Sequence, residues 1–541
     1  MLFCLSTPYP HARKPTPRPS SKPVRAAWLA LGLSLCAGWT PAAQDATPPS
    51  RTQRNAAPHS LPPAVLQALR QAQVPPSAIS VQVSPVSAPG MVAVSASGST
   101  PDLPRLAHRA AATMNPASVM KLITTYAGLS LLGPQYVWRN RVYADGPVQA
   151  GVLHGNLILR GSGDPKLVLE RLQDWMAQIN AAGVREVRGD ILLDRSVFDV
   201  SPRSEPFDDE PLRPYNVSPD GLLLNFKAVI YTFSPDVAAG LARVRYEPPL
   251  AGFEVPQELP LRAGPCNDWR RQLQADFSQS QAARFAGAYP ASCGERAWPV
   301  AFAAPEAYAT QLIRALWLAS GGRLTGQVRD GTVPARARLL LEAPSLPLSE
   351  LIADINKLSN NVMAQQLFLT LSSDLGAPGR FEASRLRVLR WWRSEFAGLP
   401  EPVLDNGSGL SRIERSNAQA LTALLHAASA SPHAQAFQNS LAIAGVDGTA
   451  ARLRERQPDS PVIGQAWLKT GSLRDVASVA GYVQGQSGQR YSVVAIINHP
   501  NANQARPALD ALLEWAVRDT NNPDSTTNTP STAQRQATIR P

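Results

Sequence analysis

The sequence predicts an α/β (α+β) protein of more than one domain, in which strands from two distant parts of the chain share one sheet. At 541 residues the chain is longer than a single hydrophobic core usually holds. Residues 78 to 97, "AISVQVSPVSAPGMVAVSAS", alternate apolar and polar side chains around a Pro-Gly turn, which is typical of a hairpin. Three further strand-like runs come near the other end, at 466 to 473, 476 to 485 and 491 to 499. Because a lone hairpin is only marginally stable, we expect these runs to join it in one sheet.

This shared sheet predicts a discontinuous domain built from residues 61–138 and 340–520, closed by the helix-period segment at 506 to 519. The interior, 139–339, has a different character. It carries short strand-like pieces such as "GNLILRG" and "GDILLDRSVF", cut by Gly, Pro and Asp. We expect an inserted β-rich region of one or two subdomains there.

The two ends of the chain lie outside these domains. Residues 1–43 combine basic residues with the apolar run "AAWLALGLSLCAGW" and small residues before Ala43, which is typical of an export signal cleaved near Ala43. Residues 44–60 and 521–541 are polar and rich in Pro, Ser and Thr, which predicts a flexible lead-in and a disordered tail. No later run reaches the ~18 apolar residues of a membrane span, so we expect a soluble exported product without a transmembrane anchor.

Charge and cysteine content narrow the function classes. Removal of the signal leaves 47 Lys and Arg against 41 Asp and Glu, scattered along the chain, which argues against nucleic-acid binding. The cysteines that remain are Cys266 and Cys293. An even pair in an exported protein predicts one disulfide, with two free thiols as the alternative.

The stretch "NPASVMKLIT", residues 115 to 124, is the first with a chemical signature. Asn115 suits a helix N-cap and Pro116 the first helical position, which places Ser118 in the first turn and Lys121 one turn later on the same face. A desolvated, neutral lysine can take the proton of a serine hydroxyl and so generate a nucleophile. The chain has seven Lys against 45 Arg. Because Arg cannot deprotonate, a retained lysine indicates a position where a base is needed.

Two more segments complete the pattern. Lys469 opens "KTGS" on a strand-like run, where Gly471 permits close backbone approach and Thr470 and Ser472 add hydroxyls, so the segment can bind a carboxylate and a reacting carbonyl. Between the lysine motifs, "KLSNNVMAQQLF" presents Ser359 and Asn361 near a turn between two helix-like segments. S-x-x-K, S-D-N and K-T-G in this order form the signature of β-lactamases and penicillin-binding proteins. Here the middle element reads Ser359-Asn360-Asn361, with Asn in place of Asp at its centre.

With these residues the chain resembles the D-alanyl-D-alanine carboxypeptidase/endopeptidases, the low-molecular-mass class C penicillin-binding proteins. The likeness extends to "GSGDP" at 161 to 165, "LLDRSVFD" at 192 to 199, "DNGSGLSR" at 405 to 412 and "GVDGTAARL" at 445 to 453. The resemblance implies a serine-transpeptidase/β-lactamase-like domain with an antiparallel five-stranded sheet and helices. Large subdomains would be inserted between the first and second motifs, and the protein would be periplasmic.

The resemblance also implies roles for single residues. Ser118 would be the nucleophile and Lys121 its base, while Ser359 and Asn361 would relay the proton and orient the substrate. Lys469 and Thr470 would hold the substrate's terminal carboxylate, with the backbone N–H groups of Ser118 and Ser472 as oxyanion hole. Further substrate contacts are expected at Asp194, Ser408 and Arg412, although a carboxylate at a strand end such as that of Asp194 is also an ordinary turn residue.

The implied substrates are the stem peptides and cross-links of peptidoglycan, with β-lactams as inhibitors and with neither metal nor cofactor. Asn406 departs from the usual Asp-Gly-Ser-Gly motif, which leaves the placement of Asp405 open. One alternative is a β-lactamase, in which Glu401 would deacylate the enzyme; an exposed loop glutamate is the other interpretation of that residue. A second alternative is a non-catalytic wall-binding protein.

Overall fold

The computed structural model describes residues 60–86, 103–201 and 206–520. The predicted export signal, nearly all of the lead-in, the tail and the second arm of the predicted hairpin lie outside these residues. Within the described ranges, none of the helices combines the length and the hydrophobicity that a bilayer-spanning segment requires.

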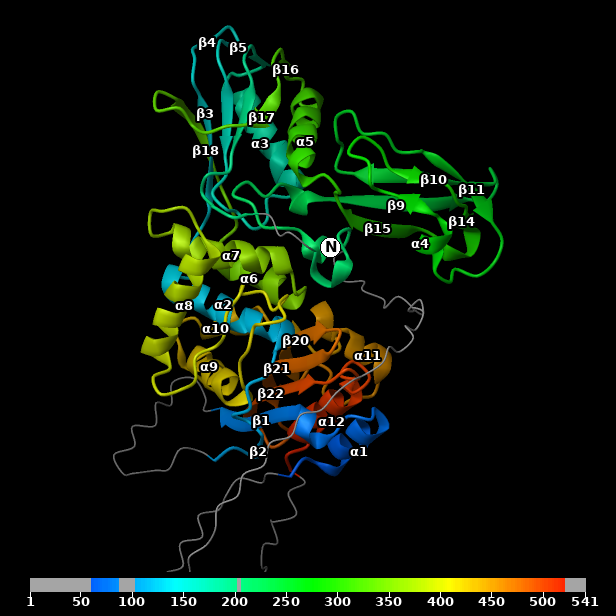
Figure 1. Ribbon diagram of the computed structural model, residues 1–541, viewed down its shortest axis with the longest axis vertical. Helices are drawn as coiled ribbons and strands as arrows, with labels where there is room; N and C mark the ends of the chain where they lie inside the picture. The colour runs from blue at the N-terminus through cyan, green and yellow to red at the C-terminus, as the bar shows by residue number, and fades with distance from the viewer. Residues whose placement is uncertain (1–59, 87–102, 202–205, 521–541) are drawn as a thin grey trace, which may run out of the picture. The chain divides into compact units, whose positions relative to one another are not determined.

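A six-stranded antiparallel sheet joins the two ends of the chain (Figure 1). Its order is β19 (Ala442–Ile443), β20 (Ala466–Leu473), β21 (Val476–Gln484), β22 (Arg490–Asn498), β1 (Ile79–Val86) and β2 (Leu106–His108). The pairing of Ile79 with Ile497 confirms that strands from both ends share the sheet. The sheet has one strand more than the expected five, because the two-residue β19 and the three-residue β2 flank the four long strands.

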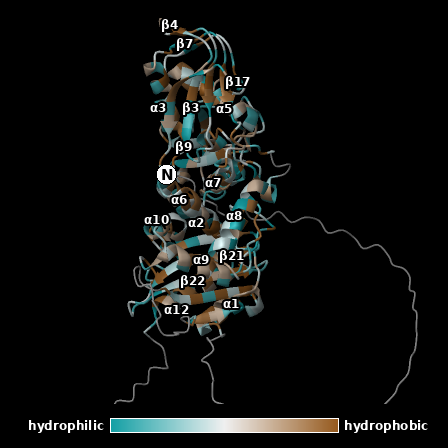
Figure 2. Cartoon of the chain, turned by 90° about the vertical axis from the view of Figure 1, so that its left-hand side faces the viewer, coloured by the Kyte–Doolittle hydropathy of each residue, from teal (hydrophilic) through white to brown (hydrophobic). Residues whose placement is uncertain are grey.

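Helices cover both faces of this sheet. α1 (Pro63–Gln71) and α12 (Arg506–Val517) pack together and share an apolar core with the sheet, which Figure 2 colours brown. α9 (Ala418–Ala430) contacts β1 and β22. As a result, every residue of β21 except the last is buried. Burial on both faces explains why the strand-like runs near the C-terminal end are almost continuously apolar.

A helical layer surrounds α2 (Lys121–Leu132), whose residues from Lys121 to Leu129 are all buried. α2 packs against α6 to α10. The helices of this layer besides α2 and α9 are α6 (Leu348–Lys357), α7 (Asn361–Ser373), α8 (Phe381–Glu395) and α10 (Ala434–Asn439). Tyr126 of α2 makes edge-to-face contacts with Trp391 and Phe437. The first motif therefore sits on a helix with little freedom to move.

The interior of the chain forms separate sheets, as the sequence predicts. One five-stranded sheet has the order β17 (Val328–Asp330), β8 (Ile191–Asp194), β6 (Leu157–Arg160), β3 (Arg139–Ala144) and β18 (Arg338–Pro344). A four-stranded sheet is formed by strands that lie between those of the first sheet along the chain. Its order is β16 (Arg323–Leu324), β7 (Glu186–Val187), β5 (Val152–Leu153) and β4 (Val148–Gln149). Because β18 pairs with β3, the sheet of the insert continues to Pro344, five residues past the expected boundary at 339.

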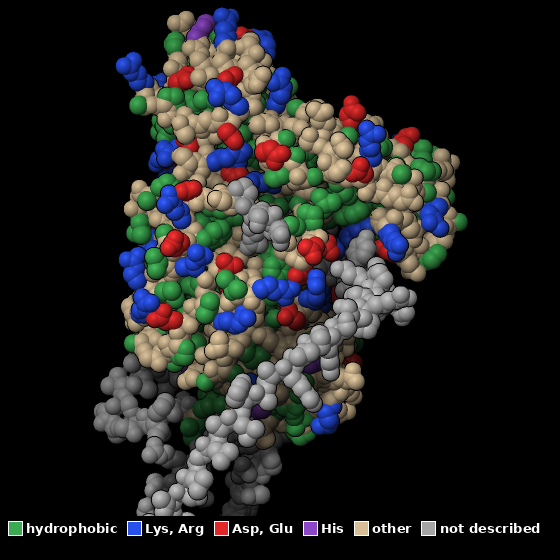
Figure 3. Space-filling model, in the orientation of Figure 1, with side chains coloured by type: hydrophobic (Ala, Val, Ile, Leu, Met, Phe, Trp, Pro, Cys, Tyr) green, Lys and Arg blue, Asp and Glu red, His purple; other side chains and the backbone are tan. Residues whose placement is uncertain are grey.

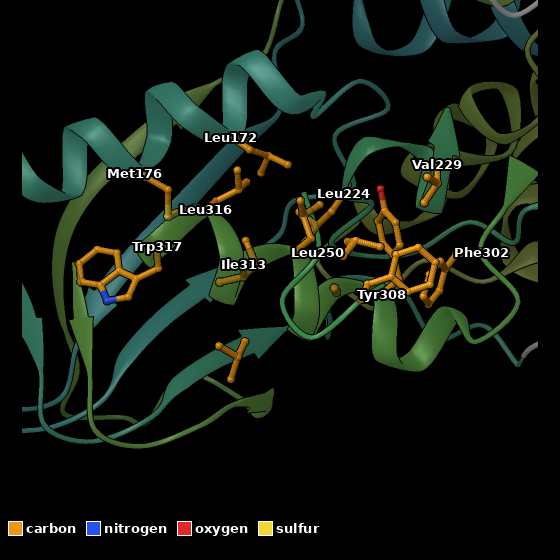
Figure 4. Packing of buried hydrophobic residues seen from close by; sticks show 14 of the residues in the cluster. Leu172, Met176, Leu224, Val229, Leu250, Phe302, Tyr308, Ile313, Leu316 and Trp317 are labelled. Atoms are coloured by element: carbon orange, nitrogen blue, oxygen red, sulfur yellow. The ribbon is translucent and has the colours of Figure 1, made fainter. Parts of the chain in front are cut away.

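Two helices complete this part of the insert. Leu172 and Met176 of α3 (Leu169–Ala181) and Ile313, Leu316 and Trp317 of α5 (Pro305–Ala319) belong to one buried cluster (Figure 4). The apolar faces of both helices therefore fill this core.

A second five-stranded sheet lies between these elements in sequence, with the order β14 (Tyr289–Pro290), β11 (Glu258–Arg262), β10 (Leu241–Glu247), β9 (Ala228–Asp236) and β15 (Arg296–Ala301). The predicted disulfide is present between Cys266 and Cys293, with their Cα atoms 4.8 Å apart. It joins the segment after β11 to the turn after β14 in a region rich in short elements, which are β12 (Ala275–Asp276), β13 (Arg284–Phe285) and α4 (Trp269–Gln272).

Charged side chains are interspersed on the face of the molecule drawn in Figure 3, with basic and acidic groups side by side. Charged side chains of neighbouring elements form ion pairs, such as that of Arg141 with Glu342 at 2.9 Å. This agrees with the scattered charge of the sequence.

Candidate active site

Ser118 lies in a 3₁₀ turn, Ala117–Met120, directly before α2. The expectation that Ser118 belongs to the first turn of the α-helix is therefore wrong by one turn. Asn115 Oδ1 accepts a hydrogen bond from the Ala117 N–H at 2.8 Å, and Ala117 has a φ of 47°, which is incompatible with a regular helix. The α-helix begins at Lys121, so Ser118 lies just before its N-terminus.

Lys121 is completely buried, and its Nζ has three oxygen partners. It lies 2.9 Å from Ser118 Oγ, 2.6 Å from Asn361 Oδ1 and 2.5 Å from the carbonyl oxygen of Ser408. Burial, and secondly the charge of Lys469, lower the pKa of Lys121 well below the ordinary lysine value, while Glu414 opposes the shift. A lysine with a lowered pKa can be neutral and accept the Ser118 proton.

The second motif lies at the turn between α6 and α7, as expected. Asn360 caps α7, its side chain accepting the Met363 N–H at 3.1 Å, and Asn361 is the first residue of that helix. Ser359 adopts a φ of 58°, and its Oγ accepts a hydrogen bond from Lys469 Nζ at 2.9 Å. The second motif therefore contacts both lysines, through Asn361 and Ser359 respectively.

The third motif lies on β20. Lys469 is completely buried and also donates to the Thr470 carbonyl at 2.7 Å, and Thr470 Oγ1 donates to Thr449 Oγ1 at 2.7 Å. A side chain at Gly471 would overlap the carbonyl oxygen of Pro116 and the hydroxyl of its cross-strand partner on β21. Glycine thus lets β20 lie directly against the turn that carries Ser118. Ser472 is exposed, and its hydroxyl accepts a hydrogen bond from Arg506.

The other expected substrate contacts have partners within the protein. Ser408 Oγ donates to Asn406 Oδ1 at 2.6 Å and is buried, so that it is the Ser408 carbonyl, rather than the hydroxyl, that meets Lys121. Asn406 is buried as well, and its amide donates to the Leu410 carbonyl at 3.0 Å, while the Asp405 carboxylate lies 3.9 Å from Arg385. The departure from the usual motif is thus accommodated by the Asn406 amide.

Arg412 and Asp194 lie in different surroundings. Arg412 is 42% exposed and pairs with Asp208 and Asp475, each at 2.5 Å. Asp194 is 2% exposed, and its carboxylate accepts the N–H groups of Ser196 at 2.9 Å and Val333 at 3.0 Å. These contacts favour the interpretation of Asp194 as a turn residue, although a buried one.

Sequence reasoning missed a contribution of the insert. Phe207 and Tyr215, in the 3₁₀ turns Phe207–Asp209 and Pro214–Asn216, pack against a small apolar cluster. Its members come from the turn that carries Ser118, from the segment after Gly409 and from β20 and β21: Ala117, Leu410, Leu473 and Val476. The Tyr215 carbonyl also accepts a hydrogen bond from Asn361 Nδ2 at 3.4 Å. The insert therefore contacts the second motif and packs beside the first and third, an arrangement that no local pattern in the sequence indicates.

Sequence reasoning also missed Glu414. This carboxylate is completely buried beneath the segment 405–409 and accepts four backbone N–H groups from it. A Gly-Ser-Gly segment outside regular structure has backbone N–H groups that need an acceptor. An acidic residue a few positions away, such as Glu414, is the one signal in the sequence for such an acceptor. Glu401, in contrast, is on the surface and pairs with Arg393 at 2.7 Å.

The fold and the three motifs define a serine hydrolase of the kind found in penicillin-binding proteins and β-lactamases. Residues 90–518 match the D-Ala-D-Ala carboxypeptidase 3 (S13) family, and the chain belongs to this family. It is a serine peptidase.

Two relatives of known name support this assignment. The D-alanyl-D-alanine carboxypeptidase of Actinomadura sp. is 29% identical over 415 residues, covering 72% of this chain and 74% of that protein. The D-alanyl-D-alanine carboxypeptidase DacB of Haemophilus influenzae is 25% identical over 398 residues, covering 71% and 80%. The crystal structure of penicillin binding protein 4 (dacB) from Haemophilus influenzae matches with a TM-score of 0.65 at 22% identity, covering 83% of this chain and 99% of that one.

Proposed function

We propose that this enzyme cleaves the terminal D-Ala-D-Ala bond and the cross-links of peptidoglycan stem peptides through an acyl-enzyme on Ser118. The observation that carries the proposal is the environment of Lys121, a fully buried amine with a lowered pKa, 2.9 Å from Ser118 Oγ. In the acylation step the Ser118 oxygen attacks the carbonyl of the penultimate D-alanine while its proton passes to Lys121. The leaving amine then takes a proton, and water releases the peptide in a second step.

The remaining residues of the site would hold the substrate. Lys469 and Thr470 would bind the terminal carboxylate at the edge of β20, and the backbone N–H groups of Ser118 and Ser472 would stabilise the oxyanion. The hydrogen bond from Lys469 to Ser359, at 2.9 Å, supports a proton path from the site towards the leaving amine. Arg412 is the most accessible of the further candidates, since it is 42% exposed.

We also propose that β-lactams acylate Ser118. A second crystal structure of penicillin binding protein 4 (dacB) from Haemophilus influenzae is a complex with a β-lactam; it matches this chain with a TM-score of 0.62 at 21% identity. A β-lactam has a strained amide next to a carboxylate and would use the same contacts as the peptide. Export to the periplasm, with cleavage near Ala43, would bring the enzyme to this substrate.

The division of the chain is part of the proposal. The catalytic domain would comprise residues 61–138 and 340–520 with the region 139–339 inserted in it, except that β18 extends the insert to Pro344. The separate sheets of the interior support this division. The contact of Tyr215 with Asn361 suggests that the insert forms one side of the substrate site.

The test is release of D-alanine from a synthetic stem pentapeptide, and of monomers from cross-linked peptide dimers. We expect both activities in the wild type, and loss of both in Ser118→Ala with the melting temperature preserved. D-alanine release by Ser118→Ala near the wild-type rate would contradict the assignment of the nucleophile.

A further inference from the structure

The Glu414 carboxylate is the centre of a compact hydrogen-bond cluster next to the active site. Its Oε1 accepts the N–H groups of Asp405 at 3.1 Å, Asn406 at 3.1 Å and Gly407 at 2.7 Å, and its Oε2 accepts that of Gly409 at 2.8 Å. Its side chain is completely buried. One carboxylate thus fixes four successive or nearly successive peptide groups of a short segment.

The shape of this segment brings its N–H groups to one acceptor. Gly407 and Gly409 have φ angles of 71° and 79°, which turn their N–H groups towards one point. Gly409 also lies directly on the nucleophile turn, since a side chain there would overlap the Ala117 carbonyl. The position of the segment relative to Ser118 therefore depends on the Glu414 carboxylate.

The opposite side of the segment faces the proposed base. The Ser408 carbonyl accepts a hydrogen bond from Lys121 Nζ at 2.5 Å, and the Gly407 carbonyl accepts one from Thr124 Oγ1 at 2.6 Å. The other acceptor of Lys121 is Asn361 Oδ1, at 2.6 Å. A neutral amine has two N–H groups and one lone pair. When the N–H groups point to these two acceptors, the lone pair is left for Ser118 Oγ at 2.9 Å.

We propose that Glu414 is a positioning residue for acylation: it holds the Ser408 carbonyl where that carbonyl orients the Lys121 lone pair towards the Ser118 hydroxyl. This inference rests on the proposed roles of Ser118 and Lys121. Glu414 neither touches substrate nor takes a proton. The Ser118 proton passes to Lys121, and Glu414 keeps the acceptor of Lys121 in place.

The acylation rate constant of the labelled enzyme separates this role from a purely structural one, and the pH profile reports the charge of Glu414 beside Lys121. The charged groups that act on Lys121 are Lys469 on β20, which lowers its pKa, and Glu414 beneath the segment, which raises it; Asp405 acts in turn on Glu414. Removing the charge of Glu414 lowers the pKa of Lys121 further. The acylation rate rises with pH as Lys121 loses its proton, and this rise, the acid limb of the profile, then moves to lower pH. A loss of stability alone leaves the acid limb in place.

The experiment compares Glu414→Gln and Glu414→Asp with the wild type, using a fluorescent penicillin to measure both the labelled fraction and the acylation rate constant against pH. In Glu414→Gln an amide NH₂ group replaces Oε2, and this group cannot accept the hydrogen bond that the Gly409 N–H donates. We therefore expect full labelling at a rate at least tenfold lower, with the acid limb of the rate profile at lower pH. Glu414→Asp keeps the charge on a shorter side chain. We expect it to have an intermediate rate and an unmoved limb.

Asp145→Asn is the matched control, because Asp145 is also a carboxylate that accepts a backbone N–H group, that of Asn156 at 2.5 Å, but it lies in a loop of the insert. We expect it to acylate at the wild-type rate. Glu414→Gln with a reduced labelled fraction but a wild-type rate constant and limb would overturn the proposal, because Glu414 would then only stabilise the fold.

If neither Glu414 variant folds, Thr124→Val loosens the same segment from its other side. We expect it to acylate at least threefold more slowly, and a wild-type rate would equally overturn the proposal. A wild-type enzyme that is not labelled at all would instead contradict the proposed function, so the two failures are distinguishable.

Discussion

Replacing Lys121 by arginine keeps the positive charge and removes the base. Lys121 is completely buried, with Ser118 Oγ, Asn361 Oδ1 and the Ser408 carbonyl within 2.9 Å of Nζ. An arginine there would stay protonated and could not accept the Ser118 proton. General base catalysis contributes about 10²–10⁴ to a rate, so we expect acylation to slow by about a thousandfold, or about 4 kcal/mol of activation free energy.

The assay is stopped-flow acylation by a fluorescent penicillin, with thermal unfolding measured on the same samples. Lys166→Arg is the matched control, because Lys166 is partly exposed and pairs with Asp354 at 2.5 Å, an interaction that arginine can reproduce. We expect this control to acylate at the wild-type rate. A folded Lys121→Arg enzyme that acylates within a few-fold of the wild type would refute the assignment of the base.

Three other predictions concern pH, deacylation and stability. The pKa of Lys121 lies well below 10.5, so the acylation rate should rise with pH and level off below the ordinary range of lysine; a half-rise near 10.5 in a pH–rate profile would contradict this. Glu401→Gln should leave hydrolysis of the acyl-enzyme unchanged, because Glu401 pairs with Arg393 on the surface; persistence of the adduct for much longer would favour the β-lactamase alternative. Replacing Cys266 and Cys293 by serine should lower the free energy of unfolding by about 3 kcal/mol for a sequence separation of 27, measured by denaturant titration, with acylation unchanged.

Much of the fold could be predicted because its signals are periodic and local. The alternation in β1 and the apolar runs of β21 and β22 indicate strands, and marginal stability of isolated hairpins indicates that they pair. The cysteine pair predicts its own disulfide. The lysine argument holds only in part. Lys121 and Lys469 are buried in the site, but three other lysines form ion pairs with aspartates, a task that arginine also performs: Lys166, Lys227 and Lys357.

The features that could not be predicted depend on contacts between distant segments. The start of α2 is displaced because Asn115 bonds the Ala117 N–H, and the adjacent Gly409 lies against the Ala117 carbonyl. The approach of Tyr215 to Asn361 joins residues 146 positions apart. Burial of Glu414 depends on the path of the glycine segment, for which sequence periodicity gives no signal.

The central claim is that Ser118 forms the acyl-enzyme. The most direct test is intact-mass spectrometry of the purified protein from residue 44 onwards after brief exposure to penicillin, followed over hours and mapped to a peptide. We predict one adduct of the mass of penicillin, located on Ser118 and persisting long enough to be mapped. An adduct on another residue, or an unmodified protein with the drug intact, would contradict the claim.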